Sequence, residues 1–422
     1  MQKAGLTALV LSVLSVLLAL SPFFHTYMPL LAEDELYVEE YILSYRLTVT
    51  YYNGGNRTLT LSDYDVSVPL FFSNELQEVE LTWSSHLVKG VFIDADGNRW
   101  AILKVPDREL APGESLSFSV EYRITSRTGE APDISVEASG TLDQIPGSLK
   151  ERYCGPAACW QTDFQPVREL AYDLSYGKEK VLDIVASFIS WIYANIRYMS
   201  YDMPRYPNET FLSRKGDCDD QANLFITLCR IVGIPAYLQI GCIYMYPLLG
   251  RHKVFSGSAW DGHVVYSSVD VGWHGWAVVY VPPWGWLPVD LTASYGLEED
   301  PLNAIRNAIY WAWVTILYRE IKTTDYISEA YEAKRYVLEN DLYIYEDEEM
   351  KLIGRTTAPR PGLTNKLARE LIFYMSITVA VIGASAISVA IILSRGAREQ
   401  EEAPGWGLTG PRTPRTTLGK AS

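Results

Sequence analysis

The N-terminal third of the chain alternates apolar and polar residues with a period of two. The clearest stretches are 41–52 and 115–122, in which aromatic and β-branched residues alternate with Ser, Thr and Arg. Such a period places one face of a strand in a core and the other face toward solvent. Turn signals at Asn53–Gly54 and Pro112–Gly113 separate these stretches, as in a sandwich of two sheets. The pattern predicts a β-sandwich domain over residues 33–147, with a role in spacing or binding.

From about residue 165 the apolar residues recur at steps of three and four instead. Residues 181–196 give an amphipathic helix by this pattern. A second helix is expected to start after Asp217, which is placed as its N-cap, and to stop at Gly233. Strands first and helices later indicate the α+β class. The second domain is predicted over residues 148–365, with a helical extension at its C-terminal end.

Two further stretches lack charges and have the length of membrane segments. Residues 4–20 follow Lys3, so residues 1–32 are expected to be a signal peptide or a membrane anchor. Residues 371–393 are also uncharged, which predicts a transmembrane helix over 367–394. Basic residues precede the first apolar run, at Lys3, and follow the second, at Arg395 and Arg398. The positive-inside rule places these flanks in the cytoplasm and therefore residues 33–365 outside the cell membrane. Residues 395–422 are expected to be a disordered cytoplasmic tail.

The composition excludes several functional classes. The chain has 422 residues, of which 48% are hydrophobic and 21% charged, so it can bury real cores. Its formal net charge is −15, which disfavours nucleic acid as a partner. Five cysteines are too few for a disulfide scaffold of this length, although Cys154 and Cys159 are close enough in sequence for a local disulfide. No pattern predicts a cofactor or a metal site.

Cys218 is the first candidate for chemistry. It falls in the first turn of the predicted helix after Asp217. Free amide N–H groups and the helix dipole at that end favour a thiolate, which is the reactive form of cysteine. The alternative is an inert, buried cysteine. Cys229 continues the apolar stripe and Cys242 falls in a predicted strand, so both are interpreted as structural.

A reactive thiol needs a base, and His274 is the candidate. It lies in a predicted strand over 272–281, and a second strand after Pro282–Pro283 leads to Asp290. An antiparallel pair of strands can bring His274 close to Asp290, which would orient the ring toward a thiol. The alternative is a histidine with a purely structural role. His263, in a similar stretch, is the rival base.

Four separated blocks resemble the transglutaminase-like superfamily. They are Gly216–Asp220, Arg230–Pro235, His274–Trp276 and Gly285–Asp290. The resemblance covers about residues 180–295 and implies a papain-like fold. It also implies Cys218 as nucleophile, His274 as base and Asp290 as the residue that orients the base. Gly275 and Leu291 depart from the family pattern, in which alanine and proline are usual. The whole chain is similar to membrane-anchored archaeal and bacterial members with an N-terminal β domain.

These observations lead to one main hypothesis and one alternative. The chain is expected to be a membrane-anchored, extracytoplasmic cysteine enzyme that acts on amide bonds in a protein or peptide through an acyl-enzyme. Hydrolysis and cross-linking share these steps, and water favours hydrolysis slightly. The alternative is a non-catalytic binding or structural protein of the cell envelope that retains the fold.

Four minor expectations complete the sequence analysis. Asn56 and Asn208 begin glycosylation sequons. Small residues recur every fourth position from Ser376 to Ser388, which favours self-association of the membrane helix. The apolar run 305–318 is expected to be a helix packed on the core. The acidic run Glu346–Glu349 is expected to be a solvated face.

Overall fold

The computed structural model describes residues 37–155, 159–246 and 250–359. Residues 38–358 form one compact unit of strands and helices, so the predicted α+β class and the β-rich N-terminal region are confirmed. The strands of the N-terminal region are β1 (Tyr37–Asn53), β2 (Leu59–Thr60), β3 (Ser67–Leu70), β4 (Gln77–Ser84), β5 (Val88–Ile93), β6 (Arg99–Leu103), β7 (Glu109–Leu110) and β8 (Ser115–Arg127).

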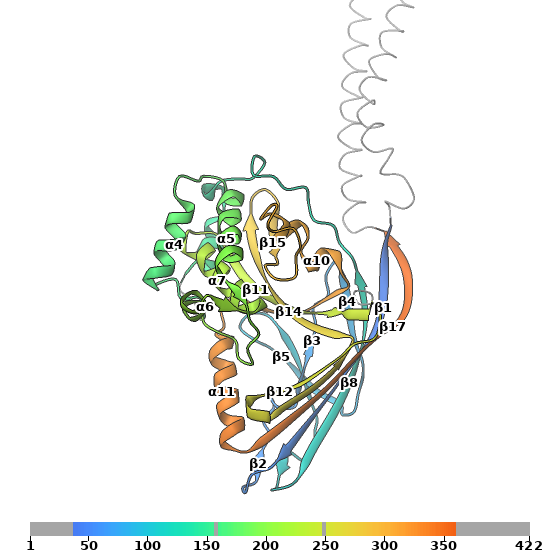
Figure 1. Cartoon of the computed structure of the whole chain (residues 1–422). Helices are drawn as coiled ribbons and strands as arrows, with labels where there is room; N and C mark the ends of the chain where they lie inside the picture. Colours follow the sequence, from blue (N-terminus) through green and yellow to red (C-terminus); the bar gives the residue numbers. More distant parts are fainter. Residues whose placement is uncertain (1–36, 156–158, 247–249, 360–422) are drawn as a thin grey trace, which may run out of the picture. The chain divides into compact units, whose positions relative to one another are not determined.

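The largest sheet combines strands from three distant parts of the chain (Figure 1). Its order is β12-β13-β17-β1-β8-β4, with β12 (Val254–Ala259), β13 (Val264–Val269) and β17 (Leu342–Pro359) added to the N-terminal strands. The strands β1 and β8 pair antiparallel from Glu40↔Arg127 to Tyr52↔Ser115, whereas β13 and β17 pair parallel. The strands predicted within residues 33–147 are therefore joined in one sheet with strands from beyond residue 250. Strand pairing between distant segments is invisible to local periodicity.

A smaller sheet covers the first one and closes a core between them. Its strand order is β3-β6-β5. Tyr45, Tyr122 and Phe71 form the centre of this core, with ring centroids 5.1 to 5.8 Å apart. Cys242 and Ile316, from the second half of the chain, are buried in the same cluster. Apolar contacts therefore join the two halves of residues 38–358.

The second half of the chain is built on a four-stranded sheet of order β15-β14-β11-β16. Its strands are β11 (Ala236–Tyr244), β14 (Val271–Val281), β15 (Gly285–Val289) and β16 (Thr315–Ile321). The helices of this half are α3 (Gly147–Tyr153), α4 (Gln165–Ser175), α5 (Val181–Asn195), α6 (Pro207–Ser213), α7 (Cys218–Ile231), α9 (Asn303–Arg306), α10 (Ile309–Ala312) and α11 (Tyr326–Glu339). Short strands β9 (Arg197–Tyr198) and β10 (Lys215–Gly216) pair beside the start of α7.

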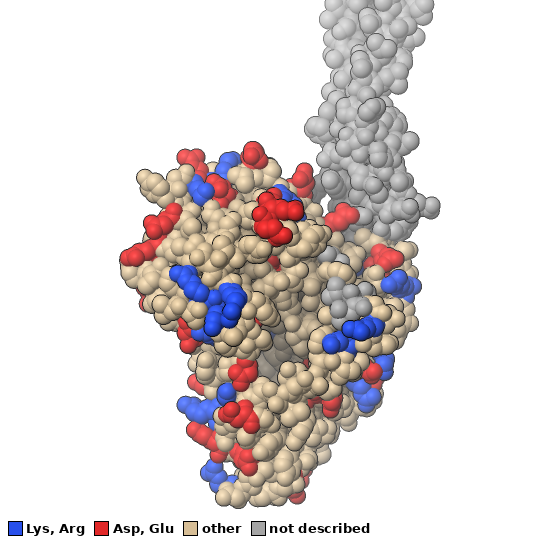
Figure 2. Space-filling view, in the orientation of Figure 1, with Lys and Arg blue, Asp and Glu red and all other residues tan. Residues whose placement is uncertain are grey.

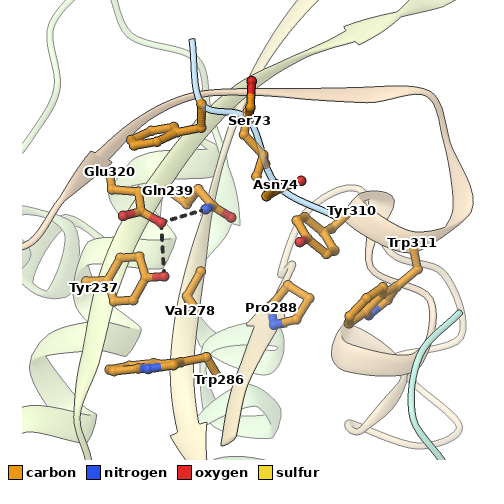
Figure 3. Close-up of a pocket in the computed structure, with 12 residues that line it drawn as sticks. Ser73, Asn74, Tyr237, Gln239, Val278, Trp286, Pro288, Tyr310, Trp311 and Glu320 are labelled. Carbon is orange, nitrogen blue, oxygen red and sulfur yellow. Dashed lines mark hydrogen bonds between the residues drawn. The ribbon is translucent and has the colours of Figure 1, made fainter. Parts of the chain in front are cut away.

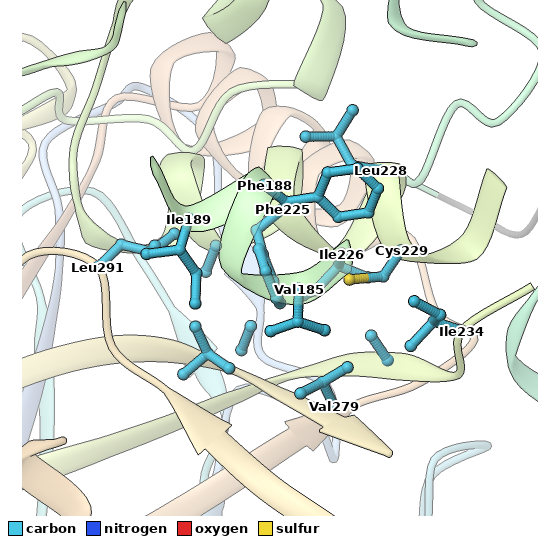
Figure 4. Close-up of a cluster of buried hydrophobic side chains, with 14 of the residues drawn as sticks. Val185, Phe188, Ile189, Phe225, Ile226, Leu228, Cys229, Ile234, Val279 and Leu291 are labelled. Carbon is cyan, nitrogen blue, oxygen red and sulfur yellow. The ribbon is translucent and has the colours of Figure 1, made fainter. Parts of the chain in front are cut away.

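Helices α4, α5 and α7 cover one face of this sheet (Figure 1). Figure 4 shows the resulting core, in which Val185 and Phe188 of α5 meet Phe225 of α7 above Val279 of β14. Each of these side chains is fully buried, and burial of one such side chain stabilises the fold by roughly 1.5–3 kcal/mol. This core fixes the position of α7 on the sheet. Cys229 lies in the same core, as predicted.

The boundaries of α7 follow from its capping residues. Asp217 is the N-cap, and Asp217 and Asp220 form a reciprocal capping box. Gly233 adopts a φ of 82°, which glycine tolerates without a steric penalty, and the helix ends just before it. The predicted start and stop of this helix are confirmed. Cys218 is consequently the first helical residue.

Arg230 in the last turn of α7 is buried and links three elements. It donates from Nε to the carbonyl of Ala236 at 2.9 Å and from Nη2 to the carbonyl of Lys322 at 3.0 Å. Its guanidinium lies 3.9 Å from the ring centroid of Trp160. Burial lowers the pKa of Arg230 to about 10, so the side chain is still charged at neutral pH. The helix end is thus tied to strand β11 and to the segment after β16.

We expect Arg230→Leu to lower the free energy of unfolding by about 2–4 kcal/mol, because two buried carbonyls lose a charged donor. Urea denaturation followed by circular dichroism measures the change. Arg335→Leu, on the exposed side of α11, is the matched control and should change the free energy by less than about 0.5 kcal/mol. Equal effects of the two variants would contradict this role for Arg230.

Two local predictions about the second half are wrong. The run 305–318 is helical only in the short helices α9 and α10, and strand β16 begins at Thr315 and pairs with β11. In the acidic run 346–349, Glu348 is buried and accepts hydrogen bonds from Tyr45 Oη, Ser268 Oγ and Trp273 Nε1. The first stretch ends in strand β16 and the second lies within β17, and neighbouring strands bury alternate residues that look exposed in sequence.

The predicted apolar N-terminal segment 1–32, transmembrane helix 367–394 and tail 395–422 lie outside the described residues. Within residues 37–155, 159–246 and 250–359, no helix has the length and apolarity needed to cross a bilayer. Cys154 and Cys159 are free thiols, so the local disulfide is not formed in this structure. Of the two sequon asparagines, Asn56 is exposed and Asn208 is partly buried.

Candidate active site

The structure places Cys218 at the start of α7, where its thiol is half-buried. The first turn of a helix carries amide N–H groups that have no partner inside the helix, and the dipole there favours negative charge. Strand β14 runs beside this helix end. Three acidic residues, Asp217, Asp219 and Asp220, surround the cysteine in sequence and shape its electrostatic environment.

His274 on β14 and Asp290 just after β15 lie next to each other. The distance from His274 Nε2 to Asp290 Oδ1 is 3.1 Å, and the two side chains are 8% and 1% exposed. The ring nitrogen makes no well-aligned hydrogen bond, so the contact is an ion pair at close range. The Cys218 thiol lies close enough to His274 to contribute, after Asp290, to the raised pKa of its ring. The expected approach of strand, turn and strand therefore brings all three residues together.

Asp290 is held by backbone amides as well as by His274. Its Oδ1 accepts from the amides of Thr292 at 3.1 Å and Ala293 at 2.9 Å, and its Oδ2 accepts from the amide of Ile309 at 3.4 Å. Burial alone would raise the pKa of Asp290, but His274 and these amides lower it below the usual range. The residue is an anion in a fixed orientation.

The charge of His274 follows from that anion. Burial lowers the pKa of His274, but the charge of Asp290 and the Cys218 thiol outweigh burial and raise the pKa to about 10. The ring therefore carries a proton at neutral pH. A cationic imidazole beside a thiol at a helix N-terminus is the arrangement that favours a thiolate–imidazolium pair.

Asp219 is part of a hydrogen-bond network that sequence analysis missed. Tyr326 of α11 donates to Asp219 Oδ2 at 2.7 Å, and Asn223 Nδ2 donates to Tyr326 Oη at 2.7 Å. Asp219 Oδ1 lies 4.0 Å from Cys218 Sγ. The network reaches the residue next to the thiol from a helix more than a hundred positions further along the chain. No local pattern around Tyr326 signals this contact.

The surroundings of Asp219 and Asp220 at the start of α7 raise the pKa of both carboxyl groups. Burial raises the pKa of Asp219 to about 7, with a further contribution from Asp217, while Tyr326 lowers it slightly. Burial and then the charge of Asp219 raise the pKa of Asp220 to about 7. Both carboxyl groups therefore bind protons more tightly in the folded chain than in the unfolded one.

We expect the fold to lose stability as pH rises from about 5 to 8, because raised carboxyl pKa values stabilise the folded state only while the groups are protonated. Asp219→Asn should raise the free energy of unfolding at pH 8 by on the order of 1 kcal/mol and change it little at pH 5. Urea denaturation of both proteins at both pH values tests this. A gain of equal size at pH 5 would show that titration of Asp219 is not the cause.

One group of neighbouring side chains could supply ligands to a metal ion. In the described part of the chain, the ligand atoms of Asp217, Cys218 and Asp219 lie within 4.8 Å of one another. They provide three donors from consecutive residues, whereas a structural zinc site has four. Asp219 is also engaged with Tyr326. The cluster fits a thiol set among acidic groups better than a metal centre.

Comparison with known families agrees with this geometry. Residues 168–291 match the family described as the transglutaminase-like superfamily. The matched segment runs from α4 to just beyond Asp290, and it contains Cys218, His274 and Asp290. This segment is similar to transglutaminase-like domains.

Two solved structures are similar to the chain. One is described as a "putative cysteine protease" from Cytophaga hutchinsonii, with 17% identity, a TM-score of 0.42 and coverage of 77% of this chain and 93% of that chain. The other is described as a "putative protease" from Parabacteroides distasonis, with 12% identity, a TM-score of 0.24 and coverage of 67% and 68%. No curated protein sequence is similar to the chain at a significant level.

The structure gives a physical reason for Gly275, which stands where alanine is usual in the family pattern. A Cβ atom at Gly275 would lie 3.0 Å from the Cβ of Asp219, which is closer than ordinary contacts allow. Gly275 thus lets β14 approach the start of α7 closely, which keeps His274 near the thiol. An alanine at this position would push against Asp219 and its contact with Tyr326.

His263, the rival base, is engaged elsewhere. Its Nε2 lies 3.0 Å from Asp341 Oδ1, and its ring stacks on Tyr343 with centroids 4.5 Å apart. It precedes β13 and contacts Asp341, next to β17, rather than Cys218. Cys229 and Cys242 are buried, and burial raises the pKa of both thiols well above the usual value. These contacts support structural roles for all three residues.

Proposed function

We propose that the protein is a cysteine enzyme that cleaves amide bonds and transfers the acyl group to water or an amine, with Cys218 as nucleophile. The single observation that carries the proposal is the placement of His274, which pairs with Asp290 at 3.1 Å and whose pKa is also raised by the nearby Cys218 thiol. The match of this segment to the transglutaminase-like superfamily supports the same class of chemistry.

Each residue has a defined part in the proposed reaction. The Cys218 sulfur attacks the amide carbon, and a C–S bond forms as the C–N bond breaks. The protonated His274 donates its proton to the leaving amine. Asp290 keeps the ring oriented and stabilises its positive charge throughout. A water or an amine then gives a proton to His274, attacks the thioester and releases the thiol.

The acceptor in the second step decides between hydrolysis and cross-linking. Water is present at a far higher concentration than any amine, so we propose hydrolysis of a protein or peptide as the main outcome. A location at the outer face of the cell membrane, held by the apolar segment 371–393, belongs to the same proposal and rests on the sequence. Acidic and basic side chains are interspersed on the face shown in Figure 2.

The proposal predicts selective alkylation of Cys218. Iodoacetamide at pH 7 should label Cys218 at least about tenfold faster than Cys154, which is also half-buried. Burial raises the pKa of the Cys154 thiol to about 11, so that residue is a matched control of similar exposure. Peptide mass spectrometry over a time course measures both rates. Equal rates would favour the alternative of a non-catalytic protein that retains the fold.

A further inference from the structure

A second concave site lies on the sheet face opposite α7, and the proposed reaction does not use it. The pocket has a volume of about 240 Å³. Val278 and Gln239 lie on its floor (Figure 3). The loop after β3 and helix α10 form its rim, and Tyr237 and Trp286 line it from the sheet. A pocket of this size holds a group as large as an amino-acid side chain.

Aromatic rings line the pocket, and the planes of neighbouring rings are steeply inclined to one another. Tyr237 and Trp286 meet at 67° with centroids 5.0 Å apart, and Tyr310 and Trp311 meet at 87° with centroids 4.7 Å apart. Phe72 adds a further ring. Ring faces carry partial negative charge and attract cations, most strongly when several rings surround one ion.

One carboxylate lies among these rings. Glu320 Oε1 accepts hydrogen bonds from Tyr237 Oη and from Gln239 Nε2, each at 3.2 Å. Burial and then Glu320 raise the pKa of Tyr237 well above its usual value, and the same two causes raise the pKa of Tyr310 to about 12. The negative charge of Glu320 is therefore felt at two separate walls of the pocket.

The protein already places one cation of its own at the margin of this site. Lys322 pairs with Glu320 Oε2, and its Nζ lies 5.6 Å from the ring centroid of Tyr237. This contact shows that a pocket ring accepts an ammonium group. It also offsets part of the charge of Glu320, so Lys322 limits the attraction that a bound cation would feel.

The pocket is held in shape by buried amide side chains. Gln77 donates to the carbonyls of Phe72 and Leu317 at 2.6 and 3.0 Å and accepts from the amide of Leu317 at 2.6 Å. Asn98 exchanges two hydrogen bonds of 2.8 Å with the backbone of Glu320. A site held this way loses little conformational entropy when a ligand binds.

The pocket is next to the candidate active site but separate from it. Trp276 donates to Gln239 Oε1 at 3.0 Å on the pocket side, and its ring centroid lies 5.9 Å from that of His274. Trp276 is 1% exposed, and its buried indole contacts both Gln239 on the pocket floor and His274. A ligand in the pocket would not contact the proposed catalytic residues.

We propose that this pocket binds a substituted ammonium ion, with the aromatic walls around its alkyl groups and Glu320 as the counter-charge. A quaternary ammonium group fits because it offers positive charge and apolar surface together and needs no hydrogen-bond acceptor. The ligand class follows from the pocket's own residues, and the site is independent of Cys218 chemistry.

Choline and its neutral isostere 3,3-dimethylbutan-1-ol test the proposal on the purified full chain. Saturable changes in tryptophan fluorescence, confirmed by calorimetry, should show choline binding at least about fivefold more tightly than the isostere, as expected for one desolvated cation–π site. Glu320→Gln should weaken choline binding severalfold. Lys322→Met, which leaves Glu320 unpaired, should strengthen it.

Two further variants locate the site. Trp286→Ala should abolish the choline response, whereas Trp284→Ala, a neighbouring tryptophan whose indole binds the carbonyl of Asp133, should retain it. Cys218→Ala should bind choline as the parent does. Equal affinities for choline and the isostere, an absent response, or a response lost in Cys218→Ala would each overturn the proposal.

Discussion

Cys218→Ala should abolish covalent acyl-enzyme formation and reduce turnover by on the order of 10⁶-fold, the size of loss seen when a triad nucleophile is removed. In the described part of the chain, the other cysteines lie elsewhere: Cys159, Cys229 and Cys242 are fully buried, and Cys154 is half-buried at the end of α3. Incubation with p-nitrophenyl acetate followed by intact-protein mass spectrometry should show one acetyl group on the parent and none on the variant.

Cys154→Ala is the matched control for this experiment and should acetylate as the parent does. Circular dichroism of both variants checks that the fold is kept, because Cys218 is half-buried and its replacement leaves little cavity. Acetylation of Cys218→Ala at the parental rate would exclude this residue as the nucleophile and remove the basis of the proposed function.

Asp290→Asn should lower turnover by about 10⁴-fold, as the equivalent change does in other triads. The substitution removes the negative charge that raises the pKa of His274. The new side-chain NH₂ group could also replace Oδ1, where it would face the backbone amides of Thr292 and Ala293. The imidazolium is then less stable and the ring less well oriented. Single-turnover acylation across pH 5 to 10 should show both the lower rate and a shift in its pH dependence.

His263→Ala is the control for this second experiment, because its ring pairs with Asp341 away from the thiol. It should change the acylation rate by less than about threefold, whereas His274→Ala should reduce it as strongly as Asp290→Asn or more. A silent Asp290→Asn, or a His263→Ala as damaging as His274→Ala, would mean that base and orienting acid have been assigned wrongly.

The elements around the candidate site could be predicted because their signals are local. An N-cap at Asp217, a glycine stop at Gly233 and a strand-turn-strand leading to Asp290 are each written in fewer than twenty neighbouring residues. The contact of Tyr326 with Asp219 depends instead on where α11 packs, and nothing near Tyr326 in the sequence reports that position. The proposed catalytic roles themselves stay predictions until the variants are measured.

The sheet arrangement shows a second limit of the sequence. Period-two patterns predicted strands β1 and β8 correctly, but the neighbours β13 and β17 lie more than two hundred residues beyond β1. Glutamate is usually a surface residue, yet Glu348 is buried, and Tyr45, Ser268 and Trp273 each donate a hydrogen bond to its carboxylate. A buried carboxylate of this kind is recognisable only when its partners are known.

The place of β17 in the largest sheet also constrains how the chain is made. In that sheet β1, one of the first strands to leave the ribosome, lies between β8 and β17, and β17 is the last strand of the described chain to be synthesised. One edge of β1 therefore stays unpaired while some three hundred residues are translated, and an open strand edge is a template for aggregation. A nascent chain released before residue 342 would carry helix α7 and strand β14 but would leave β1 and β13 without their shared neighbour, β17. The largest sheet is therefore completed only after the whole transglutaminase-like segment has been translated.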